Sequence, residues 1–332
     1  MSPRVLGARA SDVEDDDFDD FDRASGYSKP RTKTRPDYSK APTGRVLGVD
    51  RGRFAVASGE MVVHAIKARP LGRKSVVVGD QVRLLGDISG EPDALARIVE
   101  VLPRKSLLSR SADDADPVER ALVANVDQLL IVTAAADPAP SIGMIDRLII
   151  AAEVAGIAPL IVVTKTDLAS PDSLVAAYRE LGVPVVATRR GADLSAIREL
   201  LAGRVTVLVG HSGVGKSTLI NALVPGATRA TSDVNEVTGK GRHTSSSAIA
   251  LRTADANTWV IDTPGVRSFG LAGVAPEAVV TAFPDFATIA EDCPRGCQHL
   301  TGSPECALDD GRLDATHVGA LRRILDALDK ST

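Results

Sequence analysis

The eight residues from Gly210 to Ser217 have the types and spacing of a phosphate-binding loop. They read Gly-His-Ser-Gly-Val-Gly-Lys-Ser and fit the pattern G-x-x-x-x-G-K-[ST]. The apolar run 205–209 before them reads as a buried strand, and 218–224 after them reads as the opening of a helix, which disfavours a chance glycine-rich turn. Glycines let backbone N–H groups surround phosphate oxygens, Lys216 adds a positive charge, and the Ser217 hydroxyl suits Mg²⁺. The chain is therefore predicted to bind a nucleoside phosphate through Gly210, His211, Ser212, Gly213, Val214, Gly215, Lys216, Ser217 and Thr218.

A second motif, Thr-Lys-Thr-Asp at 164–167, follows the strand-like run 159–163. It resembles the guanine-recognition motif N-K-x-D of GTPases. The Asp167 carboxylate would accept hydrogen bonds from the ring N–H and the amino group of guanine, whereas adenine would leave buried groups unpaired. Lys165 would lie along the base, and Thr164 stands where asparagine is usual. The predicted base contacts are Thr164, Lys165, Thr166 and Asp167, and the alternative is a solvated loop at the end of a strand.

A third motif, Asp-Thr-Pro-Gly at 262–265, fits D-x-x-G and follows the apolar run 259–261. Asp262 would hold magnesium through a water molecule, and the Gly265 N–H would contact the γ-phosphate of a nucleoside triphosphate. A pattern this short also fits an ordinary turn after a strand, so it supports a nucleotide site only in combination with the other two motifs.

The polar segment 239–247, rich in glycine and hydroxyl side chains, suits a switch loop that becomes ordered around γ-phosphate and magnesium. Thr244 is the candidate magnesium ligand in this segment, and Ser217 is the candidate ligand in the phosphate-binding loop. Val266 occupies the position at which Ras-like enzymes have a glutamine that orients the attacking water. His243 is a candidate replacement, and the alternative is a surface histidine in a loop. The candidate catalytic residues are His243, Lys216 and Thr244.

The order of these motifs along the chain is unusual. Base recognition comes first and D-x-x-G last, whereas ordinary GTPases place base recognition last, so the sequence predicts a circularly permuted GTPase domain. Strand-like runs alternate with amphipathic segments, which predicts a parallel, doubly wound α/β sheet with ligands at the carboxyl ends of its strands. The expected strands lie in 125–133, 159–163, 184–187 and 205–209, and the expected helices at 142–155, 173–181 and 194–201.

All three cysteines lie between positions 293 and 306, in the pattern Cys-x3-Cys-x-His-x6-Cys. An odd and clustered set in a chain without a secretion signal favours a metal over disulfides. Three thiolates and one imidazole predict a structural zinc site without an open coordination position, and unrelated buried cysteines are the alternative. The predicted ligands are Cys293, Cys297, His299 and Cys306, ahead of a closing helix at 315–328.

The segment 43–110 contains four or five short strand-like runs separated by glycine turns, which predicts a small OB-like β-barrel. Its arginines and lysines fit either a nucleic-acid surface or an ordinary solvated one. Ahead of it, 12–22 holds eight acidic residues and 23–40 holds six basic ones, with few apolar residues. We expect a disordered tail there, either simply solvated or with a basic half that touches RNA.

The composition sets the broad class of the protein. The chain has 332 residues, enough for two or three domains, and 44% are apolar, enough for a real core. The net charge of −4 does not itself indicate nucleic-acid binding. No run of 18 apolar residues and no signal-peptide core occurs, so we expect a cytoplasmic protein without membrane association. We also expect it to be a monomer.

Taken together, the motifs resemble those of the RsgA (YjeQ) family of circularly permuted GTPases that depend on the small ribosomal subunit. The resemblance covers about residues 43–330 and rests on the following segments: 124–128, 164–167, 210–218, 241–244, 262–270 and the cysteine cluster. Thr164, an obscure second base-contact loop near Ala187-Thr188 and one-residue shifts in the zinc spacing depart from the family pattern.

The resemblance implies a multi-domain α/β protein that binds GTP and GDP and has zinc and magnesium as cofactors. Its partners would be the small ribosomal subunit and its rRNA. Its role would be late subunit maturation, with GTP hydrolysis timing release. Two alternatives remain: a nucleotide-gated RNA-binding protein with incidental hydrolysis, and a permuted GTPase with a non-ribosomal partner. The expected parts are a tail at 1–42, the barrel at 43–110, the GTPase domain at 111–275 and the zinc domain at 276–332.

Overall fold

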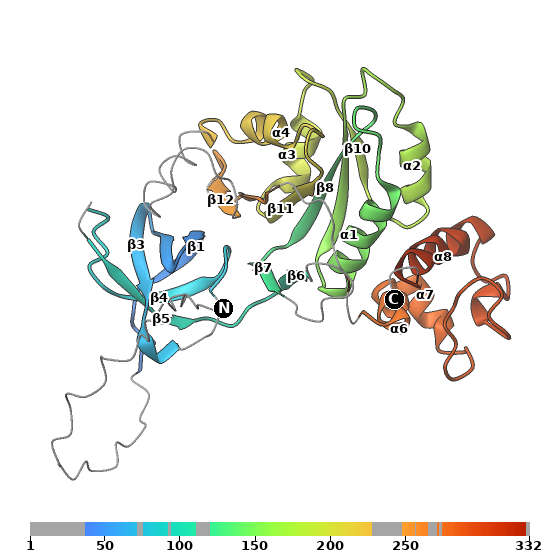
Figure 1. The fold of residues 1–332 in the computed structure, drawn as a ribbon, viewed down its shortest axis with the longest axis horizontal. Helices are drawn as coiled ribbons and strands as arrows, with labels where there is room; N and C mark the ends of the chain where they lie inside the picture. The colour runs from blue at the N-terminus through green and yellow to red at the C-terminus, as the bar shows by residue number, and fades with distance from the viewer. Residues whose placement is uncertain are drawn as a thin grey trace, which may run out of the picture. The chain divides into compact units, whose positions relative to one another are not determined.

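The computed structural model describes residues 37–71, 76–91, 94–110, 120–227, 248–255, 257–264, 271 and 274–329. Residues Tyr38–Thr332 form one unit of the chain, which contains every labelled element of Figure 1. The expected charged tail lies almost wholly outside the described residues.

Five short strands near the N-terminal end of this unit form a closed barrel (Figure 1). Their side chains alternate between the inside and the outside, because successive residues of a strand point to opposite faces. Strand β1 pairs with both β2 and β4, β2 pairs with β3, β3 runs parallel to β5, and β5 pairs with β4. The strands are β1 Thr43–Asp50, β2 Arg53–Ser58, β3 Met61–Lys67, β4 Gln81–Gly86 and β5 Ala96–Val101, with a short 3-10 helix, η1, at Arg69–Leu71.

The barrel has an apolar core of its own, separate from the larger core of the chain. The inward residues of its strands are mostly valine and other aliphatic residues, and Phe54 adds an aromatic side chain. Burial of these side chains supplies the driving force for closing so small a sheet. The predicted OB-like barrel is confirmed as a five-stranded β-barrel.

A mixed sheet forms the centre of the next part, in the order β10-β9-β8-β11-β13-β12. All neighbours in it run parallel except β12, which is antiparallel to β13. Its central strands are aliphatic and buried on both faces, as parallel strands between two layers of helices are. The strands are β8 Gln128–Ala134, β9 Ala158–Thr164, β10 Val185–Ala187, β11 Val205–Gly210, β12 Ile249–Arg252 and β13 Trp259–Asp262.

Two helices cover each face of this sheet (Figure 1), as a doubly wound sheet requires. Helices α1 Ile142–Val154 and α2 Asp172–Arg179 lie on one face, and α3 Ser195–Leu201 and α4 Lys216–Leu223 lie on the other. The apolar stripe of α1 is fully buried at Leu148 and Ile149.

The C-terminal part is helical and contains α6 Pro276–Ala282, α7 Pro284–Ala290, a 3-10 helix η2 at Ala307–Asp309 and α8 Ala315–Asp329. Helix α8 packs against α1 of the α/β part. At this contact Asp146, which is 1% exposed, accepts hydrogen bonds from the Tyr178 hydroxyl at 2.9 Å and from Arg323 Nε at 3.3 Å. Burial raises the pKa of Asp146, so the two donors offset part of the cost of burying its charge.

The structure adds elements that the sequence pattern did not predict. Strands β6 Leu107–Arg110 and β7 Arg120–Ala124 pair with each other between the barrel and the main sheet. Strand β12 and helices α6 and α7 were likewise not anticipated. The expected strand in 125–133 begins only at Gln128, and the helix expected from 218 begins at Lys216. Within the described ranges, no helix combines the length and the apolar character needed to cross a bilayer.

The Asp80–Arg104 ion pair should stabilise the join between the barrel and β6. Asp80 is fully buried and accepts hydrogen bonds from Arg104 Nε at 2.7 Å, from Arg104 Nη2 at 2.9 Å and from the Val77 N–H at 2.9 Å. Asp80→Asn removes the buried charge that pairs with the guanidinium, which should lower the free energy of unfolding by about 3 kcal/mol. Urea denaturation measures this, with Arg312→Gln, which removes exposed ion pairs to Asp292 and Asp310, as a control that should leave the free energy of unfolding almost unchanged.

Candidate functional site

The phosphate-binding motif lies between β11 and α4, in the context that the sequence predicts. Strand β11 is wholly buried between β8 and β13. Gly210, its last residue, lies so close to β8 that a Cβ atom would come within 2.4 Å of the Val132 carbonyl oxygen. Gly215, just before α4, has φ +89°, a conformation that residues with side chains rarely adopt. Steric constraints of this fold therefore explain why the motif has glycine at positions 210 and 215.

Lys216 begins α4 and is 8% exposed. Its ammonium group donates hydrogen bonds to the Asp262 carboxylate and to the Thr263 carbonyl oxygen. The Thr263 hydroxyl in turn donates to the Leu208 carbonyl of β11 at 2.6 Å. These contacts bring the phosphate-binding motif and the D-x-x-G motif together at the carboxyl ends of two adjacent parallel strands.

The tetrapeptide 164–167 begins at the last residue of β9 and lies at the same edge of the sheet. The Lys165 ammonium donates to the Asp137 carbonyl oxygen, in the segment between β8 and α1. The Thr166 hydroxyl donates to the Thr188 carbonyl oxygen at 3.1 Å. Asp167 is exposed, and within the described part of the chain its carboxylate has no hydrogen-bond partner. The carboxylate is therefore available to a ligand.

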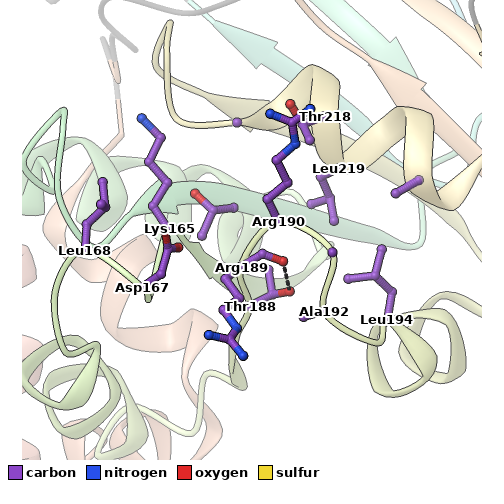
Figure 2. Close-up of a pocket in the computed structure, with 14 residues that line it drawn as sticks. Lys165, Asp167, Leu168, Thr188, Arg189, Arg190, Ala192, Leu194, Thr218 and Leu219 are labelled. Atoms are coloured by element: carbon purple, nitrogen blue, oxygen red, sulfur yellow. Dashed lines mark hydrogen bonds between the residues drawn. The ribbon is translucent and has the colours of Figure 1, made fainter.

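A pocket of about 400 Å³ opens between these segments (Figure 2). Side chains from the ends of β9 and β10 and from α4 form its walls, and Arg190 extends from the end of β10 toward Thr218. A pocket of this size suits a nucleobase with its ribose. The lining residues are Thr164, Lys165, Asp167, Leu168, Thr188, Arg189, Arg190, Gly191, Ala192, Leu194, Gly215, Thr218, Leu219 and Ala222.

The loop after β10 was missing from the predicted site residues. Thr188 is 7% exposed, and its N–H donates to the Val163 carbonyl at 2.8 Å, which holds the loop against β9. Arg189 and Arg190 are exposed at the pocket wall. The sequence signals for this loop were the family resemblance, which expected a second base-contact loop near Ala187-Thr188, its position at the carboxyl end of a parallel strand and the glycine at 191.

The predicted metal ligands come together in the C-terminal part. The ligand atoms of Cys293, Cys297, His299 and Cys306 all lie within 4.8 Å of one another. His299 Nδ1 is 3.5 Å from Cys293 Sγ and 3.9 Å from Cys306 Sγ. Two donors about 2.1 and 2.3 Å from a tetrahedral ion are about 3.6 Å apart, so the cluster fits that geometry.

The ionisation of these ligands also bears on metal binding. Burial raises the pKa of the Cys306 thiol to about 11 and lowers the pKa of His299. The imidazole is therefore neutral near pH 7, as a metal ligand must be, whereas the thiol must lose its proton to the solvent when a cation binds. The donor set fits a closed tetrahedral site.

Several predicted site residues lie outside the described residues, so the structure does not place them. They are the segment 239–247 with His243 and Thr244, and the D-x-x-G residue Gly265 with the following Val266. Ser217 and Thr218, in the first turn of α4, are described and exposed, and Thr218 lines the pocket.

Comparison with known proteins decides the family. The sequence profile of the family described as RsgA GTPase matches residues 101–272. A Pseudomonas aeruginosa protein named small ribosomal subunit biogenesis GTPase RsgA is 38% identical over 267 residues, which cover 76% of each chain. The chain belongs to the RsgA GTPase family. A protein of the same name from Nitrosomonas europaea is 34% identical over 301 residues, which cover 87% of this chain and 92% of that one.

Solved structures of the RsgA family support the fold. The crystal structure of YjeQ from Thermotoga maritima has a TM-score of 0.64 and 26% identity, and the match covers 86% of this chain and 98% of that one. YloQ, described as a circularly permuted GTPase, has a TM-score of 0.61 and 24% identity, with coverage of 88% and 96%. The resemblance stated from the motifs and the predicted fold class, a barrel followed by a permuted GTPase domain and a Cys3His region, are confirmed.

The metal cluster should be required for folding of the C-terminal part. Cys297→Ser removes a buried ligand, and we expect metal content to fall well below the one ion per chain that four ligands hold. Loss of the ion should unfold η2 and the segment around it, because metal binding and folding are coupled in small sites. Elemental analysis and limited proteolysis measure both effects. A matched change at a residue outside the cluster, Ser303→Ala, should change neither, and a metal-free protein that resists proteolysis would contradict the expectation.

Proposed function

We propose that this protein is a GTP hydrolase that acts in maturation of the small ribosomal subunit. The observation that carries the proposal is the meeting of three motifs at one edge of the sheet. A base-sized pocket with the exposed Asp167 carboxylate lies beside the phosphate-binding loop, and that loop's Lys216 contacts Asp262 of D-x-x-G. The role in maturation of the small subunit is supported by the names of the relatives, small ribosomal subunit biogenesis GTPase RsgA.

In this proposal guanine occupies the pocket that Figure 2 shows, with its N–H and amino groups bonded to Asp167. The stem of Lys165 lies along the base, and the loop 188–191 closes the opposite side. The phosphates extend toward Thr218 and the start of α4, where backbone N–H groups and the positive end of the helix favour anions. Lys216 exchanges its contact with Asp262 for the outer phosphates.

The remaining proposed contacts concern magnesium and hydrolysis. Ser217, Thr244 and, through a water molecule, Asp262 would hold magnesium, which neutralises charge that develops on the transferred phosphate. The Gly265 N–H would contact the γ-phosphate. His243 is our candidate for orienting the attacking water, because the position after Gly265 is Val266, which has no polar group.

The C-terminal cluster would hold one zinc ion, since three thiolates and an imidazole are a donor set that zinc prefers. Four protein ligands leave no position for substrate, so the ion's role is structural. The barrel and this zinc region would contact rRNA of the subunit on either side of the GTPase domain. The protein would act in the cytoplasm as a monomer, and hydrolysis would time its release from the subunit.

Guanine specificity should depend on Asp167. Asp167→Asn replaces an acceptor with an amide that cannot accept both hydrogen bonds, so the affinity for GDP should fall about 100-fold or more. Binding of xanthosine diphosphate should improve, because xanthine has a carbonyl where guanine has its amino group. Competition titration with GDP, ADP and xanthosine diphosphate measures both changes. Equal affinity of the wild type for GDP and ADP would refute the assignment of the pocket.

GTP turnover with and without purified small ribosomal subunits tests the proposed function as a whole. We expect slow turnover alone and, with subunits, an increase on the order of a thousandfold, the scale on which an added catalytic group acts. Lys216→Ala should abolish both rates, because the phosphates lose their point charge. Turnover that does not respond to subunits would favour a non-ribosomal partner.

His243→Ala refines the same experiment. It should leave GTP binding and the slow rate nearly unchanged and remove most of the stimulated rate in single-turnover measurements with saturating subunits. Undiminished stimulation would show that the water-orienting group comes from elsewhere.

A further inference from the structure

Two neighbouring arginines, Arg189 and Arg190, follow β10 at the wall of the base pocket, and their side chains point in opposite directions (Figure 2). Arg190 extends across the pocket toward Thr218, whereas Arg189 points away from it. Both arginines are exposed. Within the part of the chain that the structure describes, the Arg190 guanidinium has no hydrogen bond and no ion pair. It is therefore available to a ligand that enters the pocket.

The backbone on both sides of Arg190 is held in place. On the side of β10, the Thr188 N–H donates to the Val163 carbonyl oxygen of β9 at 2.8 Å. On the other side, the Ala192 N–H donates to the Arg189 carbonyl oxygen at 3.1 Å, which closes a turn around Arg190. The root of the Arg190 side chain is thereby fixed at the pocket wall. A ligand needs to order only the torsions of the side chain itself, which keeps the entropic cost of the contact small.

The wall that Arg190 faces is the first turn of α4. The Leu219 N–H donates to the Gly215 carbonyl oxygen at 2.9 Å and so makes the first hydrogen bond of the helix. The N–H groups before it, up to that of Thr218, have no acceptor within the helix, and together with the helix dipole they make this end positive. A cation that points at a positive helix end is repelled unless an anion lies between the two. The direction of the Arg190 side chain therefore indicates an anionic ligand.

The position of this contact selects one group of the proposed nucleotide. Thr218 lines the base pocket, so the phosphate beside it is the one joined to the ribose. Lys216 is 8% exposed and contacts Asp262, on the side where the outer phosphates would lie. Asp167 is assigned to the guanine base at the other end of the pocket. The anionic group between the base and the outer phosphates is the α-phosphate.

From this geometry we infer that Arg190 binds the α-phosphate of the guanine nucleotide, an inference that rests on the proposed function of the site. The α-phosphate lies between the Arg190 guanidinium on one side and the N–H groups of the first turn of α4 on the other. A guanidinium can donate two parallel hydrogen bonds to phosphate oxygens, which adds geometric specificity to the charge attraction. The loop after β10 thus contributes to phosphate binding as well as to the wall of the base pocket.

Arg190→Gln tests the inference, because glutamine keeps a polar side chain but removes the charge and the paired donors. We expect the affinities for GMP and GDP to fall by the same factor, about tenfold, because both ligands carry the α-phosphate. Guanosine, which has no phosphate, should bind within about twofold of its wild-type affinity. Arg190→Lys retains the charge without the paired donors and should recover part of the loss. Competition titration against a fluorescent GDP analogue supplies the three affinities.

Arg189→Gln is the matched control. It makes the same change in net charge at the adjacent position, on a side chain that points away from Thr218 (Figure 2). The affinities for GMP and GDP should stay within about twofold of the wild type. Salt provides a second readout, because Arg190 is exposed and its contact should be screened. The difference between the wild type and Arg190→Gln should therefore shrink as NaCl rises from about 0.05 M to about 0.5 M.

The possible outcomes are distinct. Equal losses for GMP and GDP in Arg190→Gln, with guanosine unchanged and Arg189→Gln like the wild type, support the inference. A loss for GDP alone would assign Arg190 to the outer phosphates, and an equal loss for guanosine would assign it to the base. Either result, an unchanged GDP affinity or an equal effect of Arg189→Gln would overturn the inference and leave the proposed GTPase function standing. A wild-type protein that binds no GDP would overturn the proposed function and this inference with it.

Discussion

The parallel pairing of β11 with β8 on one side and β13 on the other is the constraint on which the rest of the structure depends. Parallel strands end at the same edge, so residues after β9, β11 and β13 meet there although they lie up to about a hundred positions apart in the chain. The pairing also requires the glycine at 210, because β8 approaches too closely for a side chain. The chemistry of the site is therefore a consequence of strand order, and the order of the motifs along the chain does not affect it.

This independence explains how a permuted chain keeps a working arrangement. Strand β9, which ends in the tetrapeptide 164–167, precedes β11 in the sequence, yet β8 lies between them in the sheet, and their ends still converge. The permutation changes which elements follow the D-x-x-G segment. In this chain the D-x-x-G segment is followed by the helical C-terminal part. Helix α8 of that part packs against α1, where Arg323 contacts the buried Asp146. The region that carries the Cys3His cluster is thereby fastened to a helix that covers the same sheet.

The sequence predicted the parts of the site that are contiguous in the chain and failed where contacts are long-range. The phosphate-binding loop, the tetrapeptide 164–167 and the cysteine cluster each carry their signature within a few residues, so spacing alone identifies them. The loop at Thr188 has no such signature, because its role comes from pairing with β9. The short strands β6, β7 and β12 each include an arginine, so they lack the uninterrupted apolar run by which the equally short strands β10 and β13 were predicted. Asp146, Tyr178 and Arg323 come from three distant segments, and only packing joins them.

The segment 124–128, which the family resemblance singled out, shows how such packing reaches the site. Asn125 donates from its amide to the Gly79 carbonyl of the barrel at 3.1 Å and accepts from the Lys105 N–H at 2.9 Å. Two residues later, Asp127 accepts from the N–H of Val205, the first residue of β11, at 2.8 Å.

Gln128 completes this connection. Its side-chain NH₂ group donates to the Thr206 hydroxyl of β11 at 2.9 Å and to the Leu200 carbonyl oxygen at 3.1 Å. Its side-chain oxygen Oε1 accepts a hydrogen bond from Arg204 at 3.0 Å. Because Gln128 and Thr206 are almost fully buried, an unpaired group at either would be costly. One short segment thus bonds to the barrel at one end and to the strand that carries the phosphate-binding loop at the other. Its residue types are fixed by these contacts and need no direct part in the chemistry.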